Sequence, residues 1–188
     1  MAIDRRVQRT RTALYDALVR LIRRIDYDAI RVEDILAEAN VGRSTFYAHF
    51  TSKDDLLARS LERLKAELVA VAEAQQSASA DPDSIAREVS RALFLHIDAH
   101  RDVQDALAGG RGAGIVAAGI GRVLAETVRG LPIAAPEGVP RELAVEFVVA
   151  TFAAVMRYWL ERRPSMTAED ADGVFLRLVS VGLGARAT

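Results

Sequence analysis

Apolar residues recur every three or four positions along most of the chain, which is the spacing of one face of an α-helix. The first series predicts a helix with apolar positions at Val7, Leu14, Ala17, Leu18, Leu21, Ile22 and Ile25. Two shorter helices are predicted next, over residues 32–39 and about 43–49. Asn40 stands between them, and asparagine tolerates the left-handed backbone that ends a helix and makes a tight turn.

Short polar patterns predict where the longer helices begin. Three pairs of residues have the chemistry of a helix start: Ser52 with Asp55, Asp81 with Pro82, and Thr167 with Asp170. They predict a long helix from Lys53, another over about 83–99, and a last helix after Thr167.

Glycine and proline predict the interruptions between helices. The segment Gly109–Gly114 holds four glycines and is interpreted as a break before a helix of small residues that ends near Arg129. Residues 130–140 hold three prolines and are predicted to form a loop. The helix predicted over 140–163 is apolar almost all round, so it must be covered on more than one side. No strand pattern is present, and the predicted fold is all-α with about nine helices.

The segment from Val32 to Lys53 has the organisation of a DNA-reading unit. Two short helices joined by a tight turn form a helix-turn-helix, whose second helix shows polar side chains to the major groove. Val41, Phe46 and Phe50 are expected to face inward, which leaves a polar set on the other side: Arg43, Ser44, Thr45, Tyr47 and His49. Arginine pairs with guanine edges, and hydroxyl groups bond phosphates. Lys53, at the next helix start, is expected to meet a phosphate.

This segment resembles the signature of the tetracycline-repressor (TetR) family of regulators. The resemblance rests on Asp34-Ile35, Ala39-Asn40-Val41, the run from Arg43 to Phe50, and Lys53-Asp54, with Tyr27-Asp28-Ala29-Ile30 ahead of them. It covers about residues 10–57. The resemblance implies DNA contacts from Arg43, Ser44, Thr45, Tyr47, Ala48, His49 and Lys53. It also implies an N-terminal three-helix DNA-binding domain, residues 1–52, and a larger helical effector and dimerisation domain, residues 53–188.

Three residues depart from the family pattern. Arg31 stands where threonine or serine usually caps the second helix, and Gly42 stands where serine often caps the third. Glu33 lies where a basic residue is common. An N-terminal arm with four arginines, Arg5, Arg6, Arg9 and Arg11, is a further candidate for phosphate or minor-groove contacts, against the alternative of a solvated surface.

Charge and composition agree with this interpretation and exclude several others. Residues 1–53 hold ten basic and seven acidic residues, and the remainder holds 15 basic and 19 acidic residues, which makes a basic head on an acidic body. Cysteine is absent, so disulfides, thiolate metal sites and cysteine nucleophiles are excluded, and a reducing cytoplasm is expected. The charged first residues predict no signal peptide, and the apolar run 147–156 is shorter than a membrane span. No catalytic constellation, metal site or cofactor is expected.

The second half of the chain offers candidates for an effector site and a dimer interface. Six residues are candidates to line a mainly apolar ligand pocket between the helix from Lys53 and the helix over 140–163: Phe94, His96, His100, Phe152, Met156 and Tyr158. His96 and His100 also have an i, i+4 metal-ligand spacing, although surface polar groups are the favoured interpretation. The last two helices are expected to form a homodimer interface. A repressor released from an inverted repeat by a small hydrophobic ligand is the leading hypothesis; a constitutive or partner-controlled regulator is the alternative.

Overall fold

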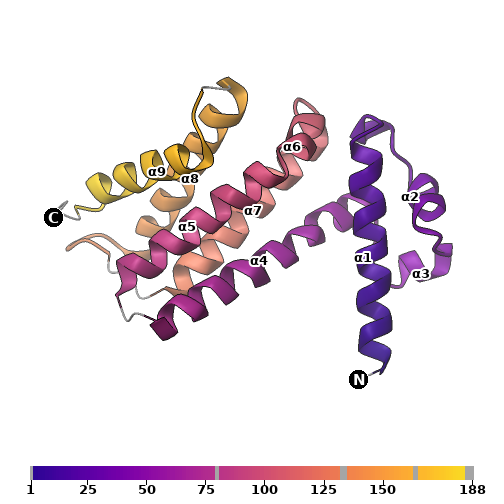
Figure 1. The fold of residues 1–188 in the computed structure, drawn as a ribbon, viewed down its shortest axis with the longest axis horizontal. Coiled ribbons are helices and arrows are strands. Elements are labelled where there is room, and N and C mark those ends of the chain that lie inside the picture. Colours follow the sequence, from indigo (N-terminus) through magenta and orange to yellow (C-terminus); the bar gives the residue numbers. More distant parts are fainter. Residues whose placement is uncertain (1, 79–80, 132–134, 163–164, 185–188) are drawn as a thin grey trace. The chain divides into compact units, whose positions relative to one another are not determined.

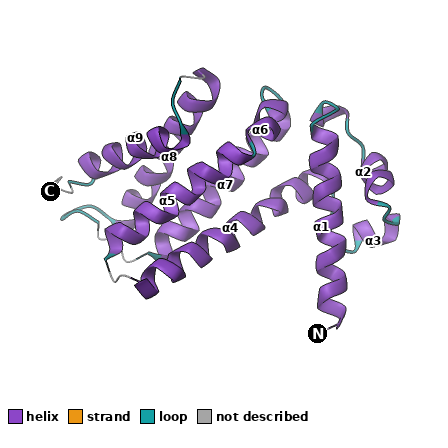
Figure 2. Cartoon of the chain, in the orientation of Figure 1, coloured by secondary structure: helices purple, strands orange, loops and turns teal. Residues whose placement is uncertain are grey.

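The computed structural model describes residues 2–78, 81–131, 135–162 and 165–184, with side chains from residue 5 onward. Within these ranges the regular structure is helical and contains no strand (Figure 2). The helices, in chain order, are α1 (Ala2–Ile22), the 3₁₀ helix η1 (Tyr27–Ala29), α2 (Val32–Ala39), α3 (Arg43–Tyr47), α4 (Lys53–Ala78), α5 (Pro82–Ala99), α6 (Arg101–Leu107), α7 (Arg111–Gly130), α8 (Arg141–Arg162) and α9 (Ala168–Gly182). The predicted all-α fold is confirmed.

The helices group into two compact units (Figure 1). Unit 1 comprises the residues up to Arg63 together with His100–Gly119. Unit 2 comprises Leu64–Ala99 together with the residues from Ile120 onward. The helices α4 and α7 each begin in unit 1 and end in unit 2. The two units are defined by contacts between residues, whereas the boundary expected between residues 52 and 53 separates two functions. That functional boundary stays a prediction.

In unit 1, α1 packs against α2, and α2 continues through a turn into α3 (Figure 1). The inner face of α1 is fully buried at the positions that the apolar pattern predicted, from Leu14 to Ile22. Asn40 ends α2 with a left-handed backbone, φ 52°, as expected for an asparagine at a helix end. The turn after α2 is closed by the amide of Val41, which donates to the carbonyl of Leu36 at 3.1 Å.

The predicted helix starts are present. At α4, the amide of Asp55 donates to Ser52 Oγ at 3.1 Å, but the Asp55 carboxylate reaches one residue further back, to the amide of Thr51 at 2.9 Å. At α9, the Thr167 hydroxyl and the Asp170 carboxylate each accept the other's amide, which completes the capping box.

The predicted break at Gly109–Gly114 is shorter than expected. The chain leaves the helix only from Ala108 to Gly110, and Gly109 has a φ of +80°. Gly112 is already inside α7, where a Cβ would lie 3.1 Å from the ring of Tyr27 and 2.5 Å from a methyl group of Leu107. Glycine therefore allows close packing here and does not break the helix. Sequence periodicity also gave no separate signal for the seven-residue α6.

Unit 2 has an aromatic core. Phe94 on α5, Phe152 and Trp159 on α8, and Phe175 on α9 are each at most 4% exposed, and the centroids of their contacting rings are 5.0–5.9 Å apart. The α9 helix packs against both α5 and α8. The indole of Trp159 donates to the carbonyl of Met166 at 3.0 Å, so its one polar atom has a partner.

One face of α8 is covered within the chain and another is not. Its buried residues are Ala144, Val145, Val148, Phe152, Val155 and Trp159. Leu143 and Phe147 lie on the uncovered side, 55% and 37% exposed. By length and composition alone α8 could cross a membrane, a test that the core helix of a soluble protein also passes.

Candidate nucleic-acid interface

The helix-turn-helix rests on a buried aromatic support. Phe46 is fully buried beneath α3, and Phe50 is 1% exposed just after it. Their ring centroids are 5.8 Å apart, and Tyr15 of α1 meets Phe50 edge-on at 5.7 Å. Because both phenylalanines point into unit 1, the residues between them must turn their side chains outward. Val41, also expected to face inward, is only half-buried.

The outward face carries the predicted reading residues. Arg43, Ser44, Thr45, Tyr47 and Ala48 are exposed, and His49 is half-buried. The structure therefore brings six of the seven predicted DNA-contact residues together on one short segment. The helix ends earlier than predicted, because α3 stops at Tyr47 and the Ala48 and His49 amides close the turn on the carbonyls of Ser44 and Phe46.

Arg43 is oriented by two neighbours. Its guanidinium lies 5.7 Å from the centroid of the Tyr47 ring, which is a cation–π contact. A guanidinium nitrogen also lies 3.4 Å from a carboxylate oxygen of Glu33, in the first turn of α2. Since both charged side chains are more than half exposed, this pair contributes little to folding and mainly biases where the guanidinium points.

Lys53, the seventh predicted contact, has hydrogen-bond partners within the protein. Its ammonium donates to the carbonyls of Tyr27 at 2.6 Å, Ile30 at 2.8 Å and Asp28 at 3.2 Å. It also lies 4.5 Å from the centroid of the Tyr27 ring. Three acceptors use all the donor capacity of an ammonium group. The first amides of α4 still offer a place for a phosphate, whereas the Lys53 charge is committed to the turn before α2.

The arginines ahead of residue 12 are on a helix and not on an extended arm. The α1 helix begins at Ala2, so Arg5, Arg6 and Arg9 project from a rigid support and are exposed. Arg11 is half-buried, and its Nε has no hydrogen-bond partner. Helical spacing places Arg5 and Arg9 on one side of α1.

Ion pairs tie α1 to α2 behind the reading face. Glu38 accepts from Arg20 Nε and from Arg24, both at 2.6 Å. The hydrogen bond from Arg20, then that from Arg24, lowers the pKa of the Glu38 carboxyl. The departures expected at the caps of α2 and α3 are also observed. Neither Arg31 nor Gly42 gives its helix a side-chain cap, although the Asp34 carboxylate accepts the Arg31 amide at 2.8 Å.

One polar residue that matters for this segment, Arg111, was missed by sequence reasoning. Tyr27, Asp54 and Arg111 are linked by hydrogen bonds although they lie up to 84 positions apart in the chain. Tyr27 and Asp54 belonged to the family pattern, but no spacing rule connects them to Arg111, which follows a glycine pair.

The six candidate ligand residues do not meet around one pocket. Phe94 and Phe152 are packed against each other in the aromatic core of unit 2, while Tyr158 is 48% exposed. Met156 is half-buried. His96 is on α5, where its Nδ1 lies 3.3 Å from a Glu67 carboxylate oxygen.

His100 lies beyond the end of α5 and precedes α6, so the two histidines do not share a helix face as their spacing suggested. No group of three potential metal ligands occurs among the described residues.

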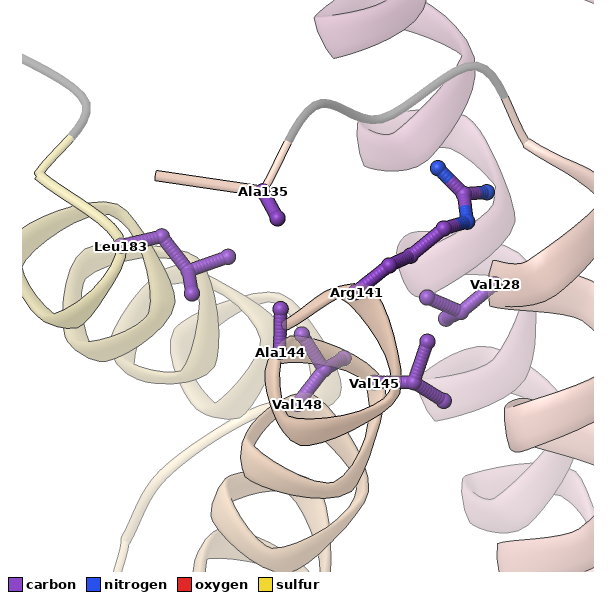
Figure 3. A pocket seen from close by; sticks show the side chains of 7 residues that line it. All are labelled: Val128, Ala135, Arg141, Ala144, Val145, Val148 and Leu183. Atoms are coloured by element: carbon purple, nitrogen blue, oxygen red, sulfur yellow. The ribbon is translucent and has the colours of Figure 1, made fainter. Parts of the chain in front are cut away.

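Two hollows are lined by described residues of unit 2. The first, about 260 Å³, lies between the end of α7, the start of α8 and the end of α9 (Figure 3). It is lined mainly by small apolar side chains, and Arg141 reaches along it while donating to the carbonyls of Arg129 and Leu131. The second, about 730 Å³ and open to solvent, lies along the first turns of α9. The first is smaller than most sites for organic ligands.

Comparison with known proteins places these observations in a family. Residues 14–59 match the model of bacterial regulatory proteins of the tetR family. A segment of 68 residues is 41% identical to the HTH-type transcriptional regulator YxbF of Bacillus subtilis (strain 168). This segment makes up 36% of this chain and 18% of that protein. The matched segment thus spans less than a fifth of that relative.

Solved structures match over almost the whole chain. A TetR transcriptional regulator from Streptococcus agalactiae 2603V is 26% identical, with a TM-score of 0.61 over 95% of this chain and 98% of that one. FadR of Thermus thermophilus, a TetR-family repressor solved with lauroyl-CoA, is 18% identical, with a TM-score of 0.65 over 95% and 97%; this likeness concerns the fold alone. Residues 14–59, with their buried support and outward polar segment, thus match the tetR family of bacterial regulatory proteins, and the chain shares the fold of solved TetR-family regulators.

Proposed function

We propose that the protein binds an inverted repeat in double-stranded DNA as a homodimer and represses transcription from the adjacent promoter. The observation that carries the proposal is the exposed polar segment from Arg43 to His49 on its buried phenylalanine support. We assign the base and phosphate contacts to Arg43, Ser44, Thr45, Tyr47, Ala48 and His49. Lys53 contributes through the position of the first turn of α4. No catalytic role is assigned, and the site of action is the cytoplasm.

Selection of bound duplexes from random DNA tests the proposal directly. The wild type is expected to enrich an inverted repeat, because two recognition helices in a dimer read two half-sites. Replacing Arg43 by alanine is expected to cost ~1–3 kcal/mol of binding and to relax one base position in each half-site. Arg122→Ala, which removes an exposed arginine from α7, is the matched control. Failure of the wild type to enrich any repeat contradicts the proposal.

The dimer is proposed to form through α8 and α9. Apolar side chains remain exposed on both helices, with Leu178 at 49% and Val181 at 82% in addition to Leu143 and Phe147. A single apolar residue on a surface is ordinary, whereas several on two packed helices indicate an interface. Val181→Glu is expected to shift the protein towards monomer in sedimentation at micromolar concentration. Val69→Glu, at an exposed valine of α4, is the control; a monomeric wild type contradicts the dimer.

Release of DNA by a small hydrophobic ligand is the finer part of the proposal. It is supported by the fold shared with a repressor that was solved with lauroyl-CoA. A specific observation favours the alternative of a constitutive or partner-controlled regulator: aromatic rings in mutual contact fill the middle of unit 2. A ligand bound at Phe94 and Phe152 would have to separate those rings. Thermal unfolding with a panel of acyl chains and other apolar compounds distinguishes the two, because a ligand that binds the native state raises the midpoint.

The sign of regulation has its own test. A reporter gene placed behind the selected repeat is expected to be more active when the protein is absent than when it is present. The opposite result would make the protein an activator and would leave the DNA interface unaffected.

A further inference from the structure

The segment that reads DNA has both of its ends tied to each other. Its entry is the turn η1, where Tyr27 is 1% exposed, and its exit is the first turn of α4. The Tyr27 hydroxyl donates to Asp54 Oδ1 at 2.6 Å. Burial, and then this hydrogen bond, raises the pKa of Tyr27 far above its ordinary value, so the hydroxyl stays a donor at neutral pH.

Lys53 makes the second connection between entry and exit. Its ammonium, on α4, donates to the carbonyls of Tyr27, Asp28 and Ile30, which immediately precede α2. Residues 31–52, which include α2 and α3, therefore form a loop closed at its base by Lys53 and by the Tyr27–Asp54 bond. Fixing the base of a loop lowers the number of conformations its interior can adopt.

The first residue of α7 holds this closed base. The Arg111 guanidinium donates to Asp54 Oδ2, the oxygen that Tyr27 leaves free. The amide of Arg111 donates to Asp28 Oδ2 at 3.3 Å. Arg111 thus contacts the exit of the loop through its side chain and the entry through its backbone. The next residue, Gly112, lies against the Tyr27 ring closely enough that a Cβ would be 3.1 Å from it.

Arg111 makes hydrogen bonds to the closed base, but its side chain remains accessible to water. The side chain of Arg111 is 71% exposed, whereas that of Asp54 is 23% exposed. An exposed guanidinium can leave its partner without unfolding the core around Tyr27, because water replaces the lost hydrogen bonds. The α6–α7 corner has a second ion pair, from Arg23 to Asp102 at 2.6 Å, which keeps the corner on α1 when Arg111 is released.

We infer that Arg111 is a positioning residue for DNA recognition, which fixes the base of the helix-turn-helix loop through Asp54 and Asp28 without touching DNA. The inference rests on the proposed DNA-binding function. It follows that a residue of α7, outside the segment that carries the family signature, sets the fraction of protein molecules in which α2 and α3 have the geometry that binds DNA. The apparent affinity for DNA scales with that fraction.

Hydrogen exchange of the free, full-length protein tests the structural half. Arg111→Ala is expected to raise the exchange rates of amides in residues 32–47 about fivefold, the upper end for an exposed ion pair. Arg122→Ala removes the same charge from an exposed position of the same helix and is expected to change nothing there. Equal rates in the two variants would overturn the inference, and this comparison stands even when no DNA sequence is selected.

DNA binding tests the functional half. Arg111→Ala is expected to weaken binding to the selected repeat by about two- to fivefold, while the dependence of affinity on salt and the base preference stay as in the wild type. Arg111→Lys, which keeps the charge, is expected to lose less affinity than Arg111→Ala. A salt slope that falls by about 1 would show that Arg111 meets a phosphate and would overturn the positioning role. Tyr27→Phe, which removes only the hydroxyl, is expected to weaken DNA binding and to raise amide exchange in residues 32–47, as Arg111→Ala does. Unchanged exchange rates in both Tyr27→Phe and Arg111→Ala would contradict the closed base.

Discussion

The turns around the reading segment in unit 1 and the core of unit 2 are ordered by different kinds of side chain. In unit 1 the contacts around the reading segment are polar and directional, with Lys53 on three carbonyls and Asp54 between Tyr27 and Arg111. In unit 2 four aromatic rings from α5, α8 and α9 fill the core. Among the described residues of unit 2, Asp172 is the one charged residue that is buried.

The difference follows from helix length. The helices α2 and α3 have eight and five residues, too short to be stable alone or to bury much apolar surface. Besides the burial of Ile35 and Phe46, they are held at their turns, where backbone carbonyls and carboxylates are the available partners. The long helices α5 and α8 each offer several apolar positions on one face, so unit 2 is ordered by packing. Polar contacts fix a geometry, whereas apolar contacts supply most of the stability.

The largest expected effect lies in the aromatic core. Trp159→Ala should lower the free energy of unfolding by ~3–5 kcal/mol, because it leaves a cavity beside the Phe94 ring and removes the partner of the Met166 carbonyl. Tyr158→Ala, at the neighbouring exposed position, should change it by less than ~1 kcal/mol. Urea unfolding measures both. Similar losses for the two variants would mean that unit 2 is not ordered by its buried rings.

The next effect separates two roles of Lys53. Lys53→Met keeps the length of the side chain but leaves three carbonyls without their donor, which should cost ~1.5–3 kcal/mol of stability. Because the ammonium faces the protein, the salt dependence of DNA binding should stay near that of the wild type. Fluorescence anisotropy across a salt series measures it. A slope lower by about 1 with unchanged stability would instead make Lys53 a phosphate contact.

Two glycines of α7 provide a smaller and sharper comparison. Gly112→Ala brings a methyl group within 3.1 Å of the Tyr27 ring, so we expect a net loss of ~0.5–2 kcal/mol after the gain in helix propensity. Gly114→Ala meets nothing within 4 Å and should stabilise the helix by ~0.5–1 kcal/mol. Thermal midpoints of opposite sign are the expected result. Stabilisation by both substitutions would show that the α7–Tyr27 packing is loose.

The smallest effect concerns pH. Desolvation by burial raises the pKa of the Asp172 carboxyl despite a hydrogen bond from the Ser90 hydroxyl. The folded state therefore holds this proton more tightly than the unfolded state, so the Asp172 contribution to stability rises as the pH falls towards its folded pKa and is lost above it. Asp172→Asn should remove this dependence and be at least as stable at neutral pH. Stability is measured between about pH 4, near the ordinary carboxyl pKa, and pH 7. If the substitution leaves the pH dependence of the wild type unchanged over this range, the role of Asp172 is contradicted.

The sequence contained enough to predict what depends on local chemistry. Caps at Ser52 and Thr167, the left-handed Asn40 and the buried face of α1 follow from rules that act over a few residues. What escaped prediction depends on distant neighbours. Gly112 looked like a helix breaker because the Tyr27 ring that requires it is 85 positions away. The three carbonyl partners of Lys53 also escaped prediction, because backbone carbonyls carry no side-chain signal.

The same limit applied to the effector site. Phe94 and Phe152 are the kind of residue that lines a pocket, and their spacing cannot tell a cavity from a filled core. The reading face was easier to predict, since an exposed position needs no partner within the chain. Arg43 and Tyr47 could therefore be assigned from periodicity around Phe46 alone.

If Arg43 contacts DNA as proposed, the carboxylate of Glu33 beside it is expected to affect how the protein searches a chromosome. Each uncompensated cation on a DNA-facing surface adds to the affinity for every stretch of duplex, and a genome presents millions of such competing stretches. A negative charge 3.4 Å from the central arginine offsets part of that general attraction. On the proposed role of Arg43, its guanidinium then exchanges the carboxylate for a guanine edge at the right sequence. Fewer copies of the protein are then held at irrelevant sites, so a small cellular pool suffices to occupy the correct one.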